Sequence, residues 1–177
     1  MRWDEFAKLR PDLASAGTEL LYQFGVDLAF LATIRADGGP RAHPMCPVLT
    51  DEGLFAFIVP SPKREDLDRD GRYWLHSFPA DQNEDAFSVR GIAARVDDRE
   101  VRTALTRRYI EERPDLDLTP DTLADQALFE FDVEGCLLTR TTGHGDPRPT
   151  HVTWRSSEVE PRRIVEGRTT GELGRPG

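Results

Sequence analysis

The feature that most constrains this chain is a series of short β-type segments separated by glycine turns. In residues 28–34 apolar side chains occupy both alternating faces, which is typical of a strand buried on both sides. Turns are expected at residues 37–39 (DGG) and 51–53 (DEG), before strands over 41–49 and 54–59. Three strands joined in this way predict an antiparallel meander and favour a sheet or a barrel.

Helical and extended segments alternate along the rest of the chain. Gly91 falls inside a long apolar segment, so we expect a bulge or a close backbone approach there. The other expected elements are helices within 1–24, a short helix after Pro62 to about residue 70, strands over 73–77 and 86–96, a helix over 100–112, and strands over 128–138 and 150–155.

The length of 177 residues suits one domain. We expect that domain to cover residues 1–155, including N-terminal helices within 1–24. Residues 156–177 are rich in Glu, Arg, Gly and Pro, with almost no apolar content. They are therefore predicted to form a flexible C-terminal tail, or an arm that lies over a partner subunit.

The charge and apolar content exclude several classes of protein. Thirty-two acidic against twenty-three basic residues give a net charge of -9, which argues against binding nucleic acid or an anionic membrane surface. No apolar stretch approaches the roughly 18 residues of a membrane helix, and no signal-peptide core follows Met1. Cys46 and Cys136 form no CxxC pair, so a reducing, cytoplasmic location is expected.

A helix start carrying two cations is the sharpest local anomaly. Ser61 suits an N-cap and Pro62 the first helical position. Lys63 and Arg64 then place two positive charges at the positive end of the helix dipole, which is unfavourable. A bound anion such as phosphate on the free N–H groups would explain this arrangement. The alternative is that both side chains are simply solvated.

A second anomaly is the segment His43-Pro44-Met45-Cys46-Pro47, because two prolines in one strand remove two ladder donors. This normally happens at edges or bulges, where backbone groups become free to face a ligand. His43 and Cys46 could also bind zinc, but no second ligand pair stands at matching spacing. Nothing marks Cys46 as an activated nucleophile, so a packed core thiol is favoured and no metal site is predicted.

The remaining aromatic residues and motifs are less informative. Tyr73, Trp74 and Trp154 could stack on a planar ligand, but aromatic residues in strands more often belong to a core or an interface. The familiar glycine-rich nucleotide loops, the HExxH metalloprotease motif and the GxSxG hydrolase motif do not occur.

Taken in order, these segments resemble one known family. The stretch LATIRADGGPRAHPMCPVLTDEGLFAFIVPSPKREDLDRDGRYWLHSF, followed by FSVRGIAARVDD, is similar to the pyridoxamine 5'-phosphate oxidase-like split β-barrel family of flavin-binding proteins. The resemblance covers about residues 26–110. The parts that match are Ala32-Thr33, Gly39-Pro40, His43 to Cys46, Phe55 to Ile58, Ser61-x-Lys63 and Arg72.

The resemblance implies a mainly β (α+β) fold, an antiparallel six- to seven-stranded split β-barrel with short flanking helices. It also implies a homodimer that binds FMN between its subunits and acts as an oxidoreductase on an unidentified small molecule. No catalytic residue is assigned, because a flavin supplies the redox chemistry itself. The residues implied in cofactor binding are His43, Pro44, Met45, Cys46, Phe57, Ser61, Pro62, Lys63, Arg64 and Trp154, the last of these from the partner subunit.

Departures from the family pattern leave the cofactor open. His43 and Pro44 stand where an Arg commonly lies beside the flavin, and Trp154-Arg155-Ser156 is not followed by the Arg-x-His of true pyridoxamine phosphate oxidases. Oxidation of vitamin B6 is therefore not expected. FMN is the first choice, and the alternatives are the deazaflavin coenzyme F-420, haem, a non-catalytic binding protein, or a cofactor-free structural homologue.

Overall fold

A computed structural model of the chain describes residues 1–156. The predicted tail from 157 onward lies outside the described residues, while Ser156 is buried and its N–H donates to the Glu134 carbonyl. The elements are α1 (Trp3–Leu9), α2 (Pro11–Leu21), β1 (Ala29–Ile34), β2 (Pro40–Met45), β3 (Val48–Leu49), β4 (Leu54–Ile58), α3 (Pro62–Arg69), β5 (Arg72–Ser77), β6 (Ala86–Arg95), α4 (Arg99–Glu111), the short 3-10 helix η1 (Pro120–Leu123), β7 (Ala127–Phe131), β8 (Gly135–Arg140) and β9 (Thr150–Arg155).

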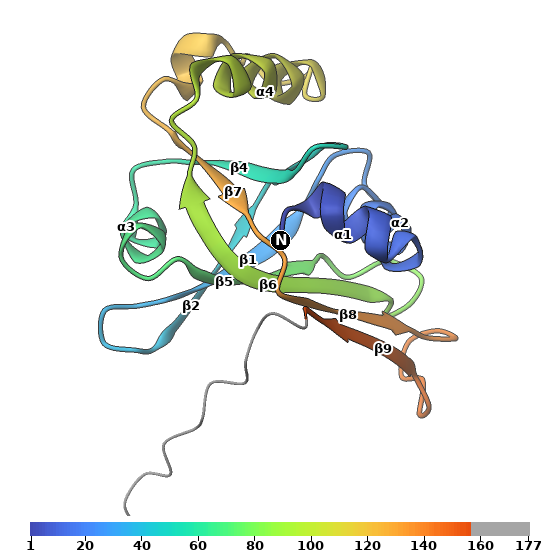
Figure 1. The fold of residues 1–177 in the computed structure, drawn as a ribbon. Helices are drawn as coiled ribbons and strands as arrows, with labels where there is room; N and C mark the ends of the chain where they lie inside the picture. The colour runs from blue at the N-terminus through green and yellow to red at the C-terminus, as the bar shows by residue number, and fades with distance from the viewer. Residues whose placement is uncertain (157–177) are drawn as a thin grey trace, which may run out of the picture.

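All strand pairs in the described part of the chain are antiparallel, and the sheet curls into a half-barrel (Figure 1). Seven strands follow the order β2-β1-β5-β6-β7-β4-β3, and β8 and β9 extend the sheet beside β6. The prediction of a mainly β, antiparallel split barrel with short flanking helices is confirmed. Within residues 1–156, no helix is long and apolar enough to cross a bilayer.

The bend of β6 at Gly91 closes the half-barrel. Before this residue β6 pairs with β8, and after it β6 pairs with β7. A Cβ on Gly91 would lie 1.8 Å from the carbonyl oxygen of Asp132, so the expected close backbone approach is confirmed. The strand predicted over 128–138 is therefore wrong as one element, because the chain crosses Gly91 at residues 132–134 and divides into β7 and β8.

Three other expectations about the strands were wrong. The segment 41–49 divides at Cys46-Pro47: its first half, β2, pairs with β1, while β3 pairs with β4. Because β4 lies beside β7, the three strands form no continuous meander. Pro44 is tolerated because β2 is an edge strand. Strand β1 is buried on one face only, and Phe30 on its other face is 38% exposed.

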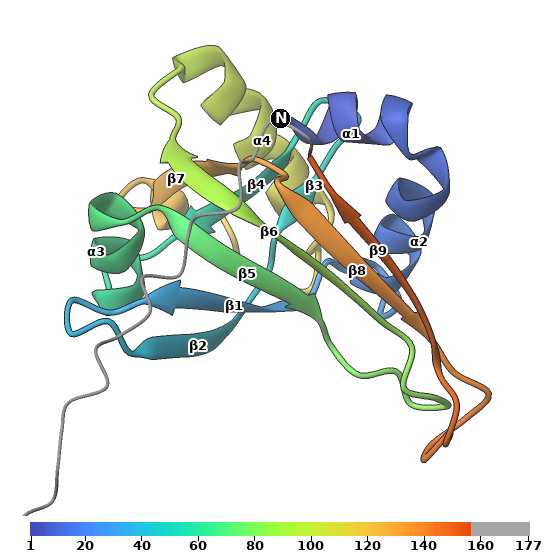
Figure 2. The ribbon, with the colours of Figure 1, turned by 60° about the horizontal axis from the view of Figure 1, so that its bottom comes forward.

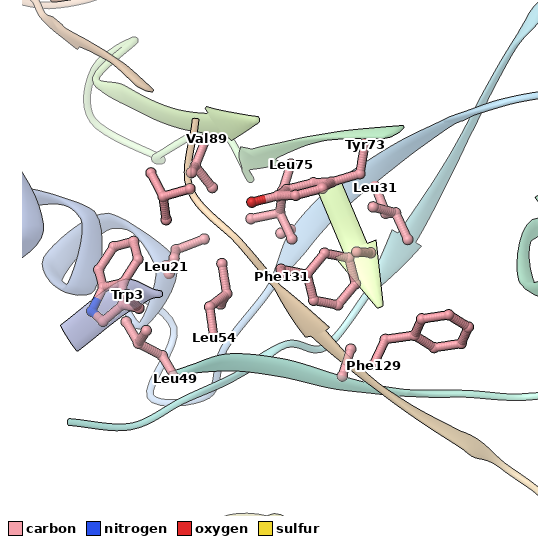
Figure 3. Packing of buried hydrophobic residues seen from close by; sticks show 14 of the residues in the cluster. Trp3, Leu21, Leu31, Leu49, Leu54, Tyr73, Leu75, Val89, Phe129 and Phe131 are labelled. Atoms are coloured by element: carbon pink, nitrogen blue, oxygen red, sulfur yellow. The ribbon is translucent and has the colours of Figure 1, made fainter. Parts of the chain in front are cut away.

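The core fills the inside of the half-barrel and is covered by α1 and α2 (Figure 1). Figure 3 shows Trp3 of α1 near Leu21, Leu49 and Leu54, with Phe131 farther inside the same cluster. A smaller cluster lies under α4 and comprises Val48, Phe55, Phe57, Leu105 and Leu128. The helices therefore complete a core that the sheet alone leaves open.

Replacing Gly91 by Ala should destabilise the protein strongly, because the new methyl group overlaps a backbone oxygen that no rotamer change can move. We expect a loss of about 3 kcal/mol or more in the free energy of unfolding, measured by urea denaturation. The matched control is Ala94→Ser, an exposed site on the same strand, which should change that free energy by no more than about 0.5 kcal/mol. Equal stabilities of the two variants would contradict this account of the bend.

Candidate functional site

The start of α3 carries the predicted anion-binding segment. Ser61 occupies the N-cap position, but its hydroxyl donates to the Val59 carbonyl at 2.9 Å and caps no helix N–H. The Ser61 carbonyl accepts the N–H groups of Arg64 and Glu65, at 2.9 and 3.2 Å. Pro62 has no N–H, so the N–H of Lys63 is the first free donor of the helix among the described residues. The expected side-chain cap is therefore wrong, although the helix begins where predicted.

Lys63 stands apart from the other cations of residues 1–156. Its side chain is half-buried, and it makes no ion pair or hydrogen bond within that range. Burial lowers the pKa of its ammonium group, while the neighbouring Cys46 opposes the shift. Every other described Lys or Arg is either held by a carboxylate or carbonyl, or exposed; Arg64, for example, donates to the Asp125 carbonyl at 3.1 Å. A desolvated cation without a partner is the arrangement that an anionic ligand would relieve.

A buried carboxylate fixes α3 against the sheet. Asp66, 3% exposed, accepts hydrogen bonds from Thr33 Oγ1 at 2.9 Å, Arg41 Nε at 2.7 Å and Arg69 Nη1 at 3.2 Å. Burial alone would raise the pKa of Asp66, but these donors outweigh it and hold the pKa below its usual value. The network joins α3 to β1 and β2, so the position of Lys63 is set by the sheet.

The wall beside Cys46 comes from β4 and α4. The rings of Phe57 and Tyr109 meet edge to face at 5.5 Å, and Arg113 stacks over Tyr109 with its Cζ 3.9 Å from the ring centre. Burial raises the pKa of the Tyr109 hydroxyl, Arg113 opposes the shift, and the nearby Cys46 adds to it. Cys46, which is half-buried, thus lies within electrostatic reach of both Lys63 and Tyr109.

The segment 43–46 runs along the edge strand β2 and turns off it at Cys46. His43 and Pro44 are exposed there. Met45, in contrast, is 7% exposed and belongs to the main core. The side chain of Met45 therefore faces away from solvent, and only its backbone remains a candidate for ligand contact.

Phe57 and Trp154 have packing roles in this chain. Phe57 is 8% exposed within the cluster under α4, and Trp154 contacts Phe6, with the ring centres 5.0 Å apart. Strand β9, which carries Trp154, and α3, which carries Lys63, lie on opposite sides of the molecule in Figures 1 and 2. A contribution of Trp154 from a partner subunit stays a prediction.

Sequence reasoning did not find Asp66 or Tyr109. Asp66 lies in the acidic and basic run EDLDRD, which looks like a solvated helix surface. Tyr109 lies on the predicted helix over 100–112, but its approach to Cys46 depends on how that helix docks. No local pattern marks either residue.

Comparisons with known proteins support the fold. No family model and no curated protein matches the chain. Among solved structures, a protein of Clostridium acetobutylicum described as related to general stress protein 26 of the pyridoxinephosphate oxidase family superposes with a TM-score of 0.55 and 14% identity, over 86% of this chain and 95% of that one. The fold is that of the pyridoxamine 5'-phosphate oxidase-like split barrels.

Two other split barrels are described by a ligand. HutZ, the haem storage protein of Vibrio cholerae, has a TM-score of 0.54 and 19% identity over 71% of this chain and 90% of its own. A haem-binding protein of Mycobacterium smegmatis has a TM-score of 0.55 and 16% identity, over 78% of this chain and 57% of its own. At these identities the likeness concerns the fold.

A buried acidic cluster anchors the C-terminal end of α4 to this split barrel. Asp27 is fully buried; its Oδ2 accepts the Leu49 N–H at 3.0 Å, and its Oδ1 has no hydrogen-bond partner within residues 1–156. Burial raises the pKa of Asp27 to about 7. Next to it the Tyr22 hydroxyl donates to Glu112 at 3.2 Å, and Glu112 also pairs with Arg113.

Asp27 should make the protein less stable as pH rises. The folded state keeps a proton that the unfolded state releases near pH 4, so stability falls between about pH 4 and pH 7 and is then level. The Asn of Asp27→Asn cannot ionise. At pH 8 the free energy of unfolding of this variant should therefore exceed that of the parent by about 1–4 kcal/mol, and at pH 4 the two should be similar, as measured by urea denaturation.

Asp115→Asn, at an exposed carboxylate without an ion pair among the described residues, is the matched control and should not change the pH profile. Greater destabilisation of Asp27→Asn at pH 8 than at pH 4 would refute the argument.

Proposed function

We propose that this split barrel is an FMN-binding flavoprotein, and that it is an oxidoreductase acting on a small molecule. The observation that carries the proposal is Lys63, the half-buried cation without a partner among the described residues, at the start of a helix. The proposal also rests on the fold shared with the pyridoxinephosphate oxidase family protein.

The start of α3 fits a phosphate group. A dianionic phosphate would accept hydrogen bonds from the Lys63 ammonium and the free Lys63 N–H, and the helix dipole adds to the attraction. The Ser61 hydroxyl could also contribute after turning away from the Val59 carbonyl. The Lys63 ammonium group loses part of its hydration by burial. A bound phosphate would compensate for this desolvation and so bind more favourably.

A bound flavin supplies hydride transfer at its ring, and the protein residues orient that ring and exclude water. The backbone of 43–46 is the proposed ring contact, because an edge strand leaves main-chain groups available. The same cation would serve the phosphate-bearing tail of coenzyme F-420. Mass spectrometry of the released cofactor distinguishes the two.

A homodimer would complete the site. Phe30 on β1 and Trp74 on β5 are 38% and 40% exposed, and both lie on the face of the sheet that points away from the core. Exposed apolar side chains that share one face of a sheet are suited to burial by a second copy of the chain. The cofactor would then lie between the two copies, as the family resemblance implies.

Haem binding is the second candidate function. The observation that favours it is His76 on β5, which is exposed and has a ring nitrogen without a partner among residues 1–156. Two of the similar structures are described as haem proteins.

Lys63→Gln should lower FMN affinity by about 10- to 100-fold, the usual loss for a charge-assisted hydrogen bond. Affinity is measured by quenching of flavin fluorescence on titration of the apoprotein. The chain has only one other lysine, so Lys8→Gln, at an exposed residue paired with Asp4, is the matched control and should bind FMN like the parent. Parental FMN affinity in Lys63→Gln would overturn the proposed phosphate site.

A further inference from the structure

The outward surface of the sheet presents two neighbouring rows of side chains. Residues directly opposite one another in antiparallel strands share a face, so the register defines each row across β1, β5, β6, β8 and β9. The first row is Phe30, His76, Ser88, Leu137 and Thr153, and the second is Ala32, Trp74, Arg90, Gly135 and Arg155. We call these ten residues the outer face; Figure 2 shows their strands side by side.

One end of the outer face is aromatic and apolar. Phe30 stacks on Phe78 with ring centres 4.2 Å apart and planes within 8°. Trp74 lies on the neighbouring strand and, like Phe30, is more than one-third exposed. Exposed aromatic rings can stack on a planar apolar ligand.

His76 brings a metal-binding atom to this surface. Its Nδ1 lies 2.6 Å from the Ser77 carbonyl oxygen, which can only accept, so Nδ1 carries the hydrogen. In the neutral ring, Nε2 is then left with a lone pair, and it has no partner within residues 1–156. A ring held by a backbone carbonyl through one nitrogen, with the other free, is the usual arrangement of a metal-ligating histidine.

Cations lie in the row next to His76. The Arg90 guanidinium extends over Gly135, with nitrogens 3.3 Å from where a Cβ would be, and is held only by a 3.7 Å pair with Glu134. Arg155 is exposed and makes no ion pair with the described residues. By the spacing of strands, Arg90 is about 5 Å and Arg155 about 14 Å across the sheet from β5. Arg155 therefore has no counterion among the described residues, and Arg90 has only the loose pair with Glu134.

We propose that the outer face binds haem: His76 Nε2 would ligate the iron, and Arg90 and Arg155 would hold the propionates. Exposed aromatic rings, a free imidazole nitrogen and nearby guanidinium groups match the three parts of haem: ring, iron and carboxylates. The inference rests on the second candidate function and does not involve Lys63. In the proposed dimer, the second copy would cover the exposed side of the ring.

The test is titration of the apoprotein with ferric haem, followed by its visible spectrum in the ferric and the dithionite-reduced states. His76→Ala should lose the histidine-ligated spectrum and at least 10-fold in affinity, and added imidazole should restore the spectrum. His144→Ala and His151→Ala, also at exposed histidines, are matched controls and should behave like the parent. The double variant Arg90→Gln, Arg155→Gln should bind more weakly with an unchanged ligation spectrum.

Each failure has a separate meaning. If the parent takes up no haem, haem binding itself is wrong, and the outer face is left as a surface for the second copy. If the parent binds haem and His76→Ala keeps the parental spectrum, haem binding stands and the assignment of His76 is overturned. Lys63→Gln should leave haem affinity unchanged, so this result is independent of the flavin proposal.

Discussion

The approach of two backbone segments at Gly91 governs the architecture of this protein. One strand, β6, must serve both halves of the barrel, and it changes partners from β8 to β7 at the point where residue 132 crosses it. A side chain there would separate the segments. Without this crossing, β4 and β7 could not close over the core, and α4 would lose the cluster on which it packs.

Ion pairing then determines which charges remain available for ligands. The Asp66 carboxylate gathers three donors and locks α3 onto β1 and β2, while Asp68 and Asp70 hold Arg95 and Arg72. Because these carboxylates neutralise the neighbouring guanidinium groups, Lys63 remains as a half-buried charge without a counterion among the described residues. The positive charge available at the candidate site therefore depends on the ion pairs of these neighbouring aspartates.

Local patterns predicted the parts of the fold that depend on local chemistry. Period-two segments, glycine turns and the proline at the start of α3 predicted most of the strands and helices. Gly91 correctly indicated a close approach of two backbone segments. The division of these two strands could not be predicted, because the breaks at 46–47 and 132–134 are set by the pairing partner of each half, which depends on the tertiary fold. The segment 61–64 was found through its charge, whereas Asp66, Tyr109 and the free nitrogen of His76 depend on docking and ring orientation.

The scarcity of lysine makes the candidate site easy to label with an amine-specific reagent. Apart from Lys8, Lys63 is the only lysine in the chain, and burial shifts it toward the neutral amine. The neutral amine is the form that attacks acylating reagents. The shift therefore makes Lys63 a better nucleophile than its ordinary pKa would allow, and a ligand seated on α3 would shield it. Acylation of a single residue can thus report occupancy of the site without knowledge of the substrate.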